Sequence, residues 1–444
     1  MRLFGTDGIR GRAGVAPLDP KTVARVGASL ARARETSTQP FRVLIGRDTR
    51  ESGPWIEQAL ATGLTSEGAQ VVSTGVVPTS AVAYLTATGG FDAGVVISAS
   101  HNPFEDNGIK VFSPSGEKLS ERTEKRIESL LHDDTWPTPQ GHPRAFTHQD
   151  LSRTYASHLR TLMPEATRLR GTRIVVDCAH GATAGLAPAL LRDIGLEVDA
   201  IGVSPDGRNI NHHCGSTYLG PLQQRVVETG AALGMAFDGD GDRTLLVDER
   251  GQVVDGDALL LILADDLHRH GRLRGQAVVA TIMSNIGLEL ALRARGIRLE
   301  RCAVGDKYVM ETMRQQGLAL GGEQSGHVIV ADHLMTGDGL GTALQVLRVL
   351  ETTGASLSSL ASALVAYPQT LVNVRVRERV DLRTVPAVAA AMARVDARLA
   401  GQGRLLVRYS GTEPLLRIML EGQQQGEIAA WAEEIATEVR THLS

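Results

Sequence analysis

The segment Asp238-Gly239-Asp240-Gly241-Asp242-Arg243 has the residue types and spacing of a metal site. It places three carboxylates at alternate positions, and the intervening glycines bring no side chains, so the carboxylates can converge on one point. Three carboxylates that close repel one another unless a cation neutralises them. Ligand sets made only of oxygen suit Mg²⁺ or Ca²⁺ rather than zinc. The segment therefore predicts a magnesium-type site, with a solvated acidic turn as the alternative.

A calcium-binding EF-hand loop is the main competitor for this segment. The three aspartates fall at loop positions one, three and five, and Glu249 falls at position twelve. However, position six of an EF-hand must be glycine, and it is Arg243 here. The flanking apolar runs, 233–237 and 244–247, are also typical of strands, whereas an EF-hand needs helices. These departures exclude the EF-hand.

A second segment, Ser98-Ala99-Ser100-His101-Asn102-Pro103, follows an apolar run and offers a nucleophile. Serine beside His101, with Lys110 downstream, supplies a nucleophile and candidate proton carriers. A polar turn at the end of a strand is the alternative. The chain lacks a Gly-x-Ser-x-Gly elbow and a Gly-x-x-x-x-Gly-Lys-Ser/Thr phosphate loop. Both a serine hydrolase and a P-loop kinase are therefore disfavoured.

Two further glycine-containing loops carry groups that bind phosphate or sugar. Arg408-Tyr409-Ser410-Gly411-Thr412-Glu413-Pro414, with Arg417 beyond it, combines guanidinium and hydroxyl groups and suits a phosphate. Gly322-Glu323-Gln324-Ser325-Gly326-His327 offers groups that could hold sugar hydroxyls or an amine. A plain hairpin turn and a structural turn are the respective alternatives. The loops 5–11 and 46–50 add arginines that could be surface charges.

An α/β scaffold is expected to position these loops. Short apolar runs predict buried strands at 41–45, 93–97, 173–176 and 277–282. Helical patterns, including 23–34 and 259–270, lie between these runs. Such alternation predicts parallel sheets, whose carboxyl ends gather ligand-binding loops. A polar stretch at 132–150 reads as a linker, and a second break falls near 367–369. Beyond that break, a half-exposed strand at 371–376, helices near 385–400 and 426–442 and a strand pair around Ser410 predict a small α+β domain.

Composition excludes several classes of protein. The 46 basic and 50 acidic residues give a net charge of -4, without the basic surface of a nucleic-acid-coating protein. Hydrophobic residues make up 42%, which is ordinary for a packed protein. The apolar runs fall far short of the ~20 residues that a spanning helix needs, and no signal-peptide core follows the first residues. Three cysteines without Cys-x-x-Cys spacing predict neither disulfides nor a zinc knuckle. We therefore expect a cytoplasmic protein that binds neither nucleic acid nor membrane.

The four loops, in this order, resemble those of the α-D-phosphohexomutase superfamily, and the resemblance runs from Phe4 to about Gly422. It implies an α/β fold of four domains around a central cleft, namely three related α/β domains with mixed or parallel sheets and a smaller C-terminal α+β domain. The expected bounds are 1–150 with the phosphoserine loop, 151–253 with the metal loop, 254–366 with the sugar loop and 367–444 with the phosphate loop.

The resemblance also implies roles for particular residues. Ser100 would carry a phosphoryl group, and Asp238, Asp240 and Asp242 would hold one Mg²⁺ together with the phosphoserine. His101, Lys110 and Arg10 would surround the reacting oxygen. The implied substrate-binding residues are Arg243, Glu323, Ser325, His327, Arg408, Ser410, Gly411, Thr412 and Arg417.

Within the superfamily, the opening 4–11, Gln324 and Gly411 favour the branch that acts on glucosamine phosphates. The implied reaction interconverts glucosamine 6-phosphate and glucosamine 1-phosphate through a sugar 1,6-bisphosphate, and supplies UDP-N-acetylglucosamine for cell-wall precursors. A phosphomannomutase or phosphoglucomutase, and a non-catalytic sugar-phosphate-binding protein, are the alternatives. The resemblance leaves a homodimer open.

Overall fold

The computed structural model describes residues 3–5, 7–34, 39–133, 135–163, 167–410 and 414–444. The chain forms two compact units, each described here by itself: one comprises Met1–Met283 and Leu299–Ser362, the other Ser284–Arg298 and Ala363–Ser444. Among the described residues, no helix has both the length and the apolar character that crossing a membrane would require.

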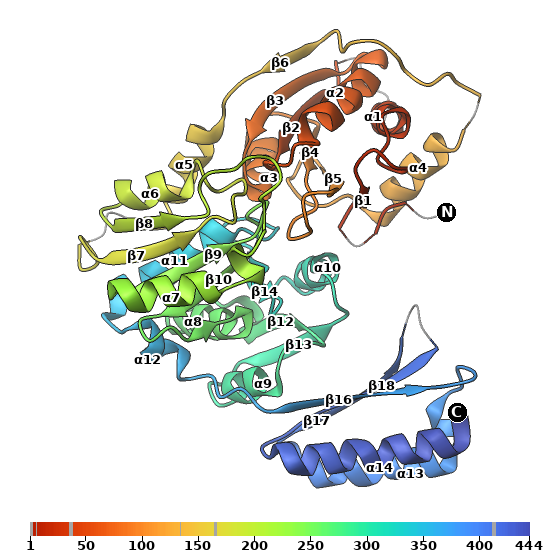
Figure 1. The fold of residues 1–444 in the computed structure, drawn as a ribbon, viewed down its shortest axis with the longest axis vertical. Helices are drawn as coiled ribbons and strands as arrows, with labels where there is room; N and C mark the ends of the chain where they lie inside the picture. Colours follow the sequence, from red (N-terminus) through yellow and green to blue (C-terminus); the bar gives the residue numbers. More distant parts are fainter. Residues whose placement is uncertain (1–2, 6, 35–38, 134, 164–166, 411–413) are drawn as a thin grey trace. The chain divides into compact units, whose positions relative to one another are not determined.

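The first unit begins with a mixed sheet in the order β1-β5-β4-β2-β3-β6 (Figure 1). Strands β2, β3, β4 and β6 run parallel, whereas β5 pairs antiparallel with both β4 and β1. The bounds are β1 Ile9–Arg12, β2 Arg42–Arg47, β3 Gln70–Val76, β4 Ala93–Ile97, β5 Asp106–Phe112 and β6 Phe146–His148, with α1 Pro20–Ala33, α2 Gly53–Ser66, α3 Thr79–Thr88 and α4 Glu121–Leu131.

Local sequence explains why these elements form where they do. Asp19 caps α1 by accepting a hydrogen bond from the Thr22 amide at 3.0 Å, and Pro20 occupies the first helical turn. Every residue of β4 is buried, as its unbroken apolar run predicts for a central strand. The polar segment that follows β4 is thereby delivered to the end of the sheet.

Two smaller mixed sheets complete the first unit. Their orders are β11-β10-β9-β7-β8 and β13-β12-β14-β15. The strands are β7 Arg173–Asp177, β8 Glu197–Ile201, β9 Leu233–Phe237, β10 Thr244–Asp248, β11 Val253–Val254, β12 Ala277–Thr281, β13 Arg298–Cys302, β14 Leu320–Gly322 and β15 Val328–Val330. The helices that accompany them are α5 Ser152–Arg160, α6 Ala187–Asp193, α7 Gly220–Thr229, α8 Gly256–Arg269, α10 Asp306–Gln316, α11 Gly339–Thr353 and α12 Leu357–Ala361.

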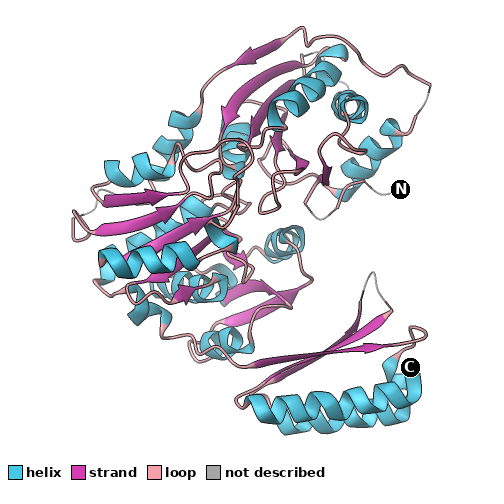
Figure 2. Ribbon diagram, viewed as in Figure 1, coloured by secondary structure: helices cyan, strands magenta, loops and turns pink. Residues whose placement is uncertain are grey.

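The second unit is built on an antiparallel sheet, β16-β18-β17, with helices along one face (Figure 2). Its elements are β16 Gln369–Arg375, β17 Arg404–Tyr409, β18 Leu415–Glu421, α13 Pro386–Leu399 and α14 Gln425–Leu443. Helix α9, Ile286–Arg293, belongs to this unit as well. Asn285 and the Tyr367 backbone exchange two hydrogen bonds of 2.9 Å, and the Ile286 amide donates to buried Glu421 at 3.2 Å.

The structure decides one expectation about the elements and corrects another. Of the mixed or parallel sheets that were expected, the three sheets of the first unit are mixed, because β5, β10 and β15 return antiparallel to their neighbours. The stretch 132–150, expected to be only a linker, contains strand β6, which pairs with β3 at the sheet edge. Its brevity and polar composition concealed it, since three residues are too few to show an alternating pattern.

Candidate active site

The loop between β9 and β10 gathers its three aspartates into one buried cluster. Ligand oxygens of Asp238, Asp240 and Asp242 all lie within 4.8 Å of one another. Among the described residues, Asp240 Oδ1 and Asp242 Oδ1 are buried without a hydrogen-bond partner. A buried carboxylate oxygen without a partner is unfavourable in apolar surroundings. The donor set and these two oxygens therefore fit a hard divalent cation such as Mg²⁺.

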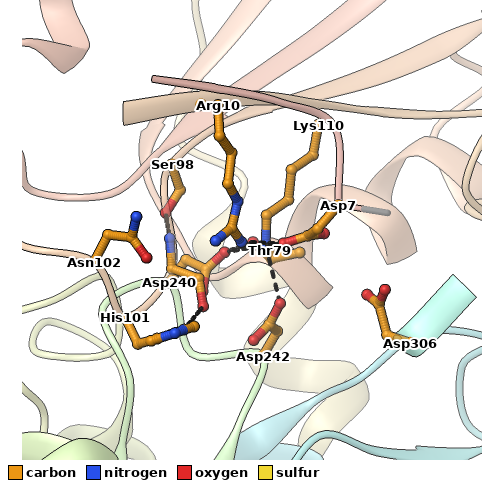
Figure 3. Close-up of polar contacts among 12 residues, drawn as sticks. Asp7, Arg10, Thr79, Ser98, His101, Asn102, Lys110, Asp240, Asp242 and Asp306 are labelled. Carbon is orange, nitrogen blue, oxygen red and sulfur yellow. Dashed lines mark hydrogen bonds and ion pairs between the residues drawn. The ribbon is translucent and has the colours of Figure 1, made fainter. Parts of the chain in front are cut away.

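Lys110, on the central part of β5, reaches the same cluster (Figure 3). Its Nζ lies 2.7 Å from Asp240 Oδ2 and 3.0 Å from Asp242 Oδ2, and the side chain is 2% exposed. Burial disfavours the charged amine, but the facing carboxylates outweigh it and raise the pKa of Lys110 well above its usual value. Lys110 is therefore a buried cation that partly neutralises the metal loop.

Ser100 faces the metal loop from the end of β4. Its Oγ donates to Asp238 Oδ2 at 2.5 Å and lies 3.3 Å from His101 Nδ1. Burial, followed by repulsion from Asp242 and Asp240, raises the pKa of Asp238 well above its usual value. Burial, followed by Arg243 and Arg10, lowers the pKa of His101 to about 4. At neutral pH the imidazole beside Ser100 is therefore uncharged.

The loop between β14 and β15, which contains Glu323, is joined to the metal loop. Arg243 and His327 form an isolated antiparallel bridge, and the Thr244 amide donates to Gly326 O at 3.1 Å. Gly326 has φ +91, and a Cβ there would lie 2.1 Å from Thr244 O. Glycine is therefore required at this contact.

The contacts of Glu323 tie the loop to its own domain and to the metal loop. Its carboxylate accepts a hydrogen bond from the Gly305 amide at 3.1 Å. Burial, the largest influence on the pKa of Arg243, lowers it, but Asp242, Asp238 and Glu323 outweigh burial and raise that pKa. The phosphoserine, metal and sugar loops predicted from the sequence thus meet within one compact unit.

Comparisons with known proteins cover the whole chain. Models of the phosphoglucomutase/phosphomannomutase family match as alpha/beta/alpha domain I at 1–138, domain II at 153–251, domain III at 255–367 and the C-terminal domain at 371–438. Proteins named phosphoglucosamine mutase from Syntrophotalea carbinolica and Myxococcus xanthus are each 47% identical, over 100% of this chain and 98% of their own. A solved phosphoglucomutase/phosphomannomutase family protein from Burkholderia thailandensis is 25% identical, with a TM-score of 0.80 over 99% of this chain and 97% of its own.

The chain belongs to the α-D-phosphohexomutase superfamily. The resemblance drawn from the four loops is confirmed, as is the predicted fold class of three α/β domains and a C-terminal α+β domain. The predicted enzyme class, an isomerase of the mutase type, is confirmed as well.

The phosphate loop of this phosphohexomutase lies in the second unit. Arg408, the last but one residue of β17, lies opposite Arg417 on β18, and Ser410 is 3% exposed beyond the strand end. Gly411 and Thr412 lie outside the described residues. The predicted phosphate-binding role of this loop therefore stays a prediction.

Several charged residues at the site were not predicted from the sequence. Asp7 lies 3.1 Å from the Lys110 ammonium and accepts a hydrogen bond from Arg10, the predicted neighbour of the reacting oxygen. Lys118 pairs with Asp7 at 2.6 Å and also with Asp306, which Figure 3 shows at the third-domain side of the site. Burial opposes ionisation of Asp7, but Lys110, Lys118 and Arg10 hold the pKa of that carboxyl well below its usual value.

Their separation in the sequence explains why these residues escaped notice. Asp7, Lys118 and Asp306 come from three distant segments, and no motif in any of them marks the residue. Thr79, which donates to Asp240 Oδ2 at 2.6 Å from the start of α3, escaped for the same reason. The one available signal was Asp7 within the glycine-rich opening loop, a segment that composition alone left as surface charge.

Proposed function

We propose that this protein interconverts glucosamine 6-phosphate and glucosamine 1-phosphate through a phosphorylated Ser100. The observation that carries the proposal is the direct contact of Ser100 Oγ with the aspartate cluster, 2.5 Å from Asp238 Oδ2. The full-length relatives named phosphoglucosamine mutase support the choice of the amino sugar. The proposal also includes a cytoplasmic location and a sugar 1,6-bisphosphate as intermediate and activator.

In the proposed first step, phosphoserine transfers its phosphoryl group to O1 of glucosamine 6-phosphate. The bond from phosphorus to Ser100 Oγ breaks, a bond to the sugar oxygen forms, and the hydroxyl proton leaves to a base. The bisphosphate then turns over, and its 6-phosphoryl group returns to Ser100 to release glucosamine 1-phosphate. Transfer of this kind depends mainly on positioning and charge neutralisation.

The side chains predicted from the sequence are suited to each part of that step. Asp238, Asp240 and Asp242 would hold Mg²⁺, which supplies charge neutralisation at the phosphoryl group when bound. Lys110 and Arg10 would place positive charge beside the transferred group, and uncharged His101 is suited to hold the hydroxyl proton. Glu323, Ser325 and His327 would contact the sugar. Arg408, Ser410, Gly411, Thr412 and Arg417 would hold the phosphate that is not transferred.

A coupled assay with Mg²⁺ and a trace of sugar 1,6-bisphosphate tests the proposal. It compares glucosamine 6-phosphate with glucose and mannose phosphates, for the wild type and Ser100→Ala, while mass spectrometry measures phosphate on Ser100. We expect a strong preference for the amino sugar and a loss of turnover in the variant. Preference for glucose or mannose phosphate would replace the substrate with that of a phosphoglucomutase or phosphomannomutase. Absence of both turnover and phosphorylated Ser100 would indicate a non-catalytic sugar-phosphate-binding protein.

A further inference from the structure

The segment after β2, Asp48-Thr49-Arg50, has no part in the reaction described above. Its arginine is no surface charge: Arg50 is 1% exposed and Asp48 is fully buried. They form an ion pair, with Arg50 Nε 2.8 Å from Asp48 Oδ2, and the Arg50 amide donates to Asp48 Oδ1 at 3.0 Å. Such a buried pair is tolerated only where its remaining donors and acceptors are satisfied.

The remaining guanidinium donors of Arg50 bind the loop that carries Ser100. One terminal nitrogen donates to the carbonyls of Ser100 at 3.0 Å and Asn102 at 2.8 Å. The other donates to the carbonyl of Asp106 at 2.9 Å and to that of Pro103. Because the guanidinium is planar and rigid, it fixes these four backbone groups relative to one another.

Asp48 holds the opposite side of Ser100 through Ser98. The Ser98 hydroxyl donates to Asp48 Oδ2 at 2.6 Å and accepts from the Ser100 amide at 2.8 Å. The contacts therefore close into a ring that runs from Asp48 to Ser98, to the Ser100 amide, through the Ser100 carbonyl to Arg50, and back to Asp48. Ser100 has φ +55, a conformation uncommon for residues other than glycine, and persists in it because these neighbours hold it.

We propose that Asp48, Arg50 and Ser98 form a buried ring that positions the Ser100 hydroxyl for phosphoryl transfer, a role that rests on the proposed function of Ser100. A backbone held at both its amide and its carbonyl fixes the direction of the Cα–Cβ bond. The hydroxyl then stays directed at Asp238, 2.5 Å away. The three ring residues act through Ser100, and they are positioning residues. Displacement of a reacting group by about 1 Å costs roughly a hundredfold in rate.

Ser98→Ala opens the ring by removing one hydroxyl, and the chain offers a matched control. Ser73 lies on β3 of the same sheet, is 1% exposed against 0% for Ser98, donates to the Glu57 carboxylate and accepts from the Gly75 amide at 3.2 Å. Ser73→Ala therefore removes the same two kinds of hydrogen bond outside the ring. Asp48→Asn, which keeps the side-chain volume, is a second way to open the ring.

Each variant is measured for kcat and KM, melting temperature, and deuterium exchange of peptide 98–104. For Ser98→Ala we expect kcat to fall by about tenfold to a hundredfold with KM within about threefold, and faster exchange in that peptide. Ser73→Ala should keep kcat within about twofold and leave that exchange unchanged.

Two results would overturn the positioning role. One is a kcat for folded Ser98→Ala equal to that of Ser73→Ala. The other is failure of both ring variants to fold while Ser73→Ala folds, which would show that the ring is needed only for folding of the domain. If the wild type turns over no hexose phosphate but deuterium exchange in peptide 98–104 changes in Ser98→Ala as expected, the proposed function is wrong. The ring would then still be shown to fix the backbone at Ser100.

Discussion

The charged side chains at the site are of two kinds, carboxylates that lie close together in one loop and cationic side chains that come from other elements. The metal loop contributes three buried carboxylates, and Lys110 from β5 touches two of them. In surroundings of low dielectric constant, that ammonium both stabilises the carboxylates and competes with a metal for them. Lys110 and Mg²⁺ should therefore oppose each other in binding.

Lys110→Met tests this opposition, because methionine keeps the length of the side chain and removes its charge. We expect the Mg²⁺ dissociation constant to fall by about tenfold, since a cation beside the ligand oxygens is removed. We also expect kcat to fall by about a hundredfold, since in the proposed reaction Lys110 places positive charge beside the transferred group. Titration calorimetry and steady-state kinetics measure the two effects. Lys118→Met, which removes a cation from Asp7 and Asp306, should change Mg²⁺ affinity less; weaker binding in Lys110→Met would contradict the competition.

Helix α11 is the element that ties the parts of the first unit together. Near its C-terminal end, the Glu351 carboxylate accepts from the amides of Thr167, Arg168 and Leu169 at 3.1, 2.7 and 2.8 Å. Burial is the largest single influence and raises the pKa, but the hydrogen bond from the Thr167 hydroxyl and the three amide bonds together outweigh it and lower the pKa of Glu351 from 4.5 to about 2. A carboxyl group whose pKa is lower in the folded state than in the unfolded state stabilises the folded state at every pH above its unfolded-state pKa. That stabilisation is lost as the pH falls from the unfolded-state pKa through the folded-state pKa.

Glu351→Gln should therefore destabilise the fold in a pH-dependent way. At pH 7 we expect a melting temperature about 2 °C below the wild type, a small effect because the carboxylate is partly exposed. Below pH 4.5 the gap should narrow, because protonating the unfolded wild type removes its advantage. Melting curves between pH 7 and pH 3.5 measure this. A gap that stays constant across that range would be inconsistent with the charged carboxylate as its cause.

The N-terminal end of α11 is held by a buried hydroxyl. Asp338 caps the helix through the Gly341 amide at 2.9 Å and accepts from Tyr155 of α5 at 2.6 Å. The Tyr155 hydroxyl also lies 2.7 Å from Ser80 Oγ on α3, so that one hydroxyl joins three helices. The next helical residue, Gly339, donates to Gly241 O of the metal loop at 3.0 Å.

Tyr155→Phe should lower the free energy of unfolding by about 1–2 kcal/mol, because it removes one hydrogen bond from the buried Asp338 carboxylate and the contact between the Tyr155 hydroxyl and buried Ser80 Oγ. Urea denaturation measures the loss. Tyr84→Phe is the control, since the half-buried Tyr84 packs its ring on His158 at 4.0 Å and should lose less. Equal losses of unfolding free energy in the two variants would show that the hydrogen bonds of the Tyr155 hydroxyl do not stabilise the fold.

Local pattern predicted the elements well and the contacts between them poorly. The apolar run 93–97 coincides with β4, and the alternate aspartates do converge, because both properties are set by neighbouring residues. Arg50 could not be recognised as buried, because its partners lie about fifty residues away along the chain. The bonds of Asn285 and Ile286 to Tyr367 and Glu421 went unpredicted as well, because these partners lie 82 and 135 residues away along the chain. Long-range pairing of this kind leaves no periodic signal.

At the scale of the whole molecule, the second unit combines two separate stretches of chain. Asn285 links them through Tyr367 and Glu421, and Glu421 is 1% exposed and pairs with Arg404 at 2.8 Å. Asn285→Ala removes these bonds and leaves the partly buried backbone of Tyr367 with fewer partners. The stability of the second unit should therefore depend on a residue outside the C-terminal sequence.

Calorimetry tests that dependence. In Asn285→Ala we expect the melting transition of the second unit to move down by about 4–8 °C, because a loss of about 1 kcal/mol in the free energy of unfolding has that effect in a domain of this size. The melting transition of the first unit should stay unchanged. Glu289→Ala, on the same helix and with a surface pair to Arg293, should shift it by about 1 °C or less. An equal shift in the two variants would show that α9 does not support the C-terminal sheet.

The divided second unit also bears on how the protein is made. A ribosome delivers α9 before the whole of Leu299–Ser362, and β18, whose Glu421 receives the Ile286 amide, emerges after all of these residues. The nascent chain therefore holds an apolar helix without its partner while the third sheet is already able to form. Since domains generally fold as units during translation, α9 can be covered only after the stretch that contains β18 has been made. A stop codon after Ser362 would leave α9 exposed on the surface of an otherwise folded product, a state prone to aggregation.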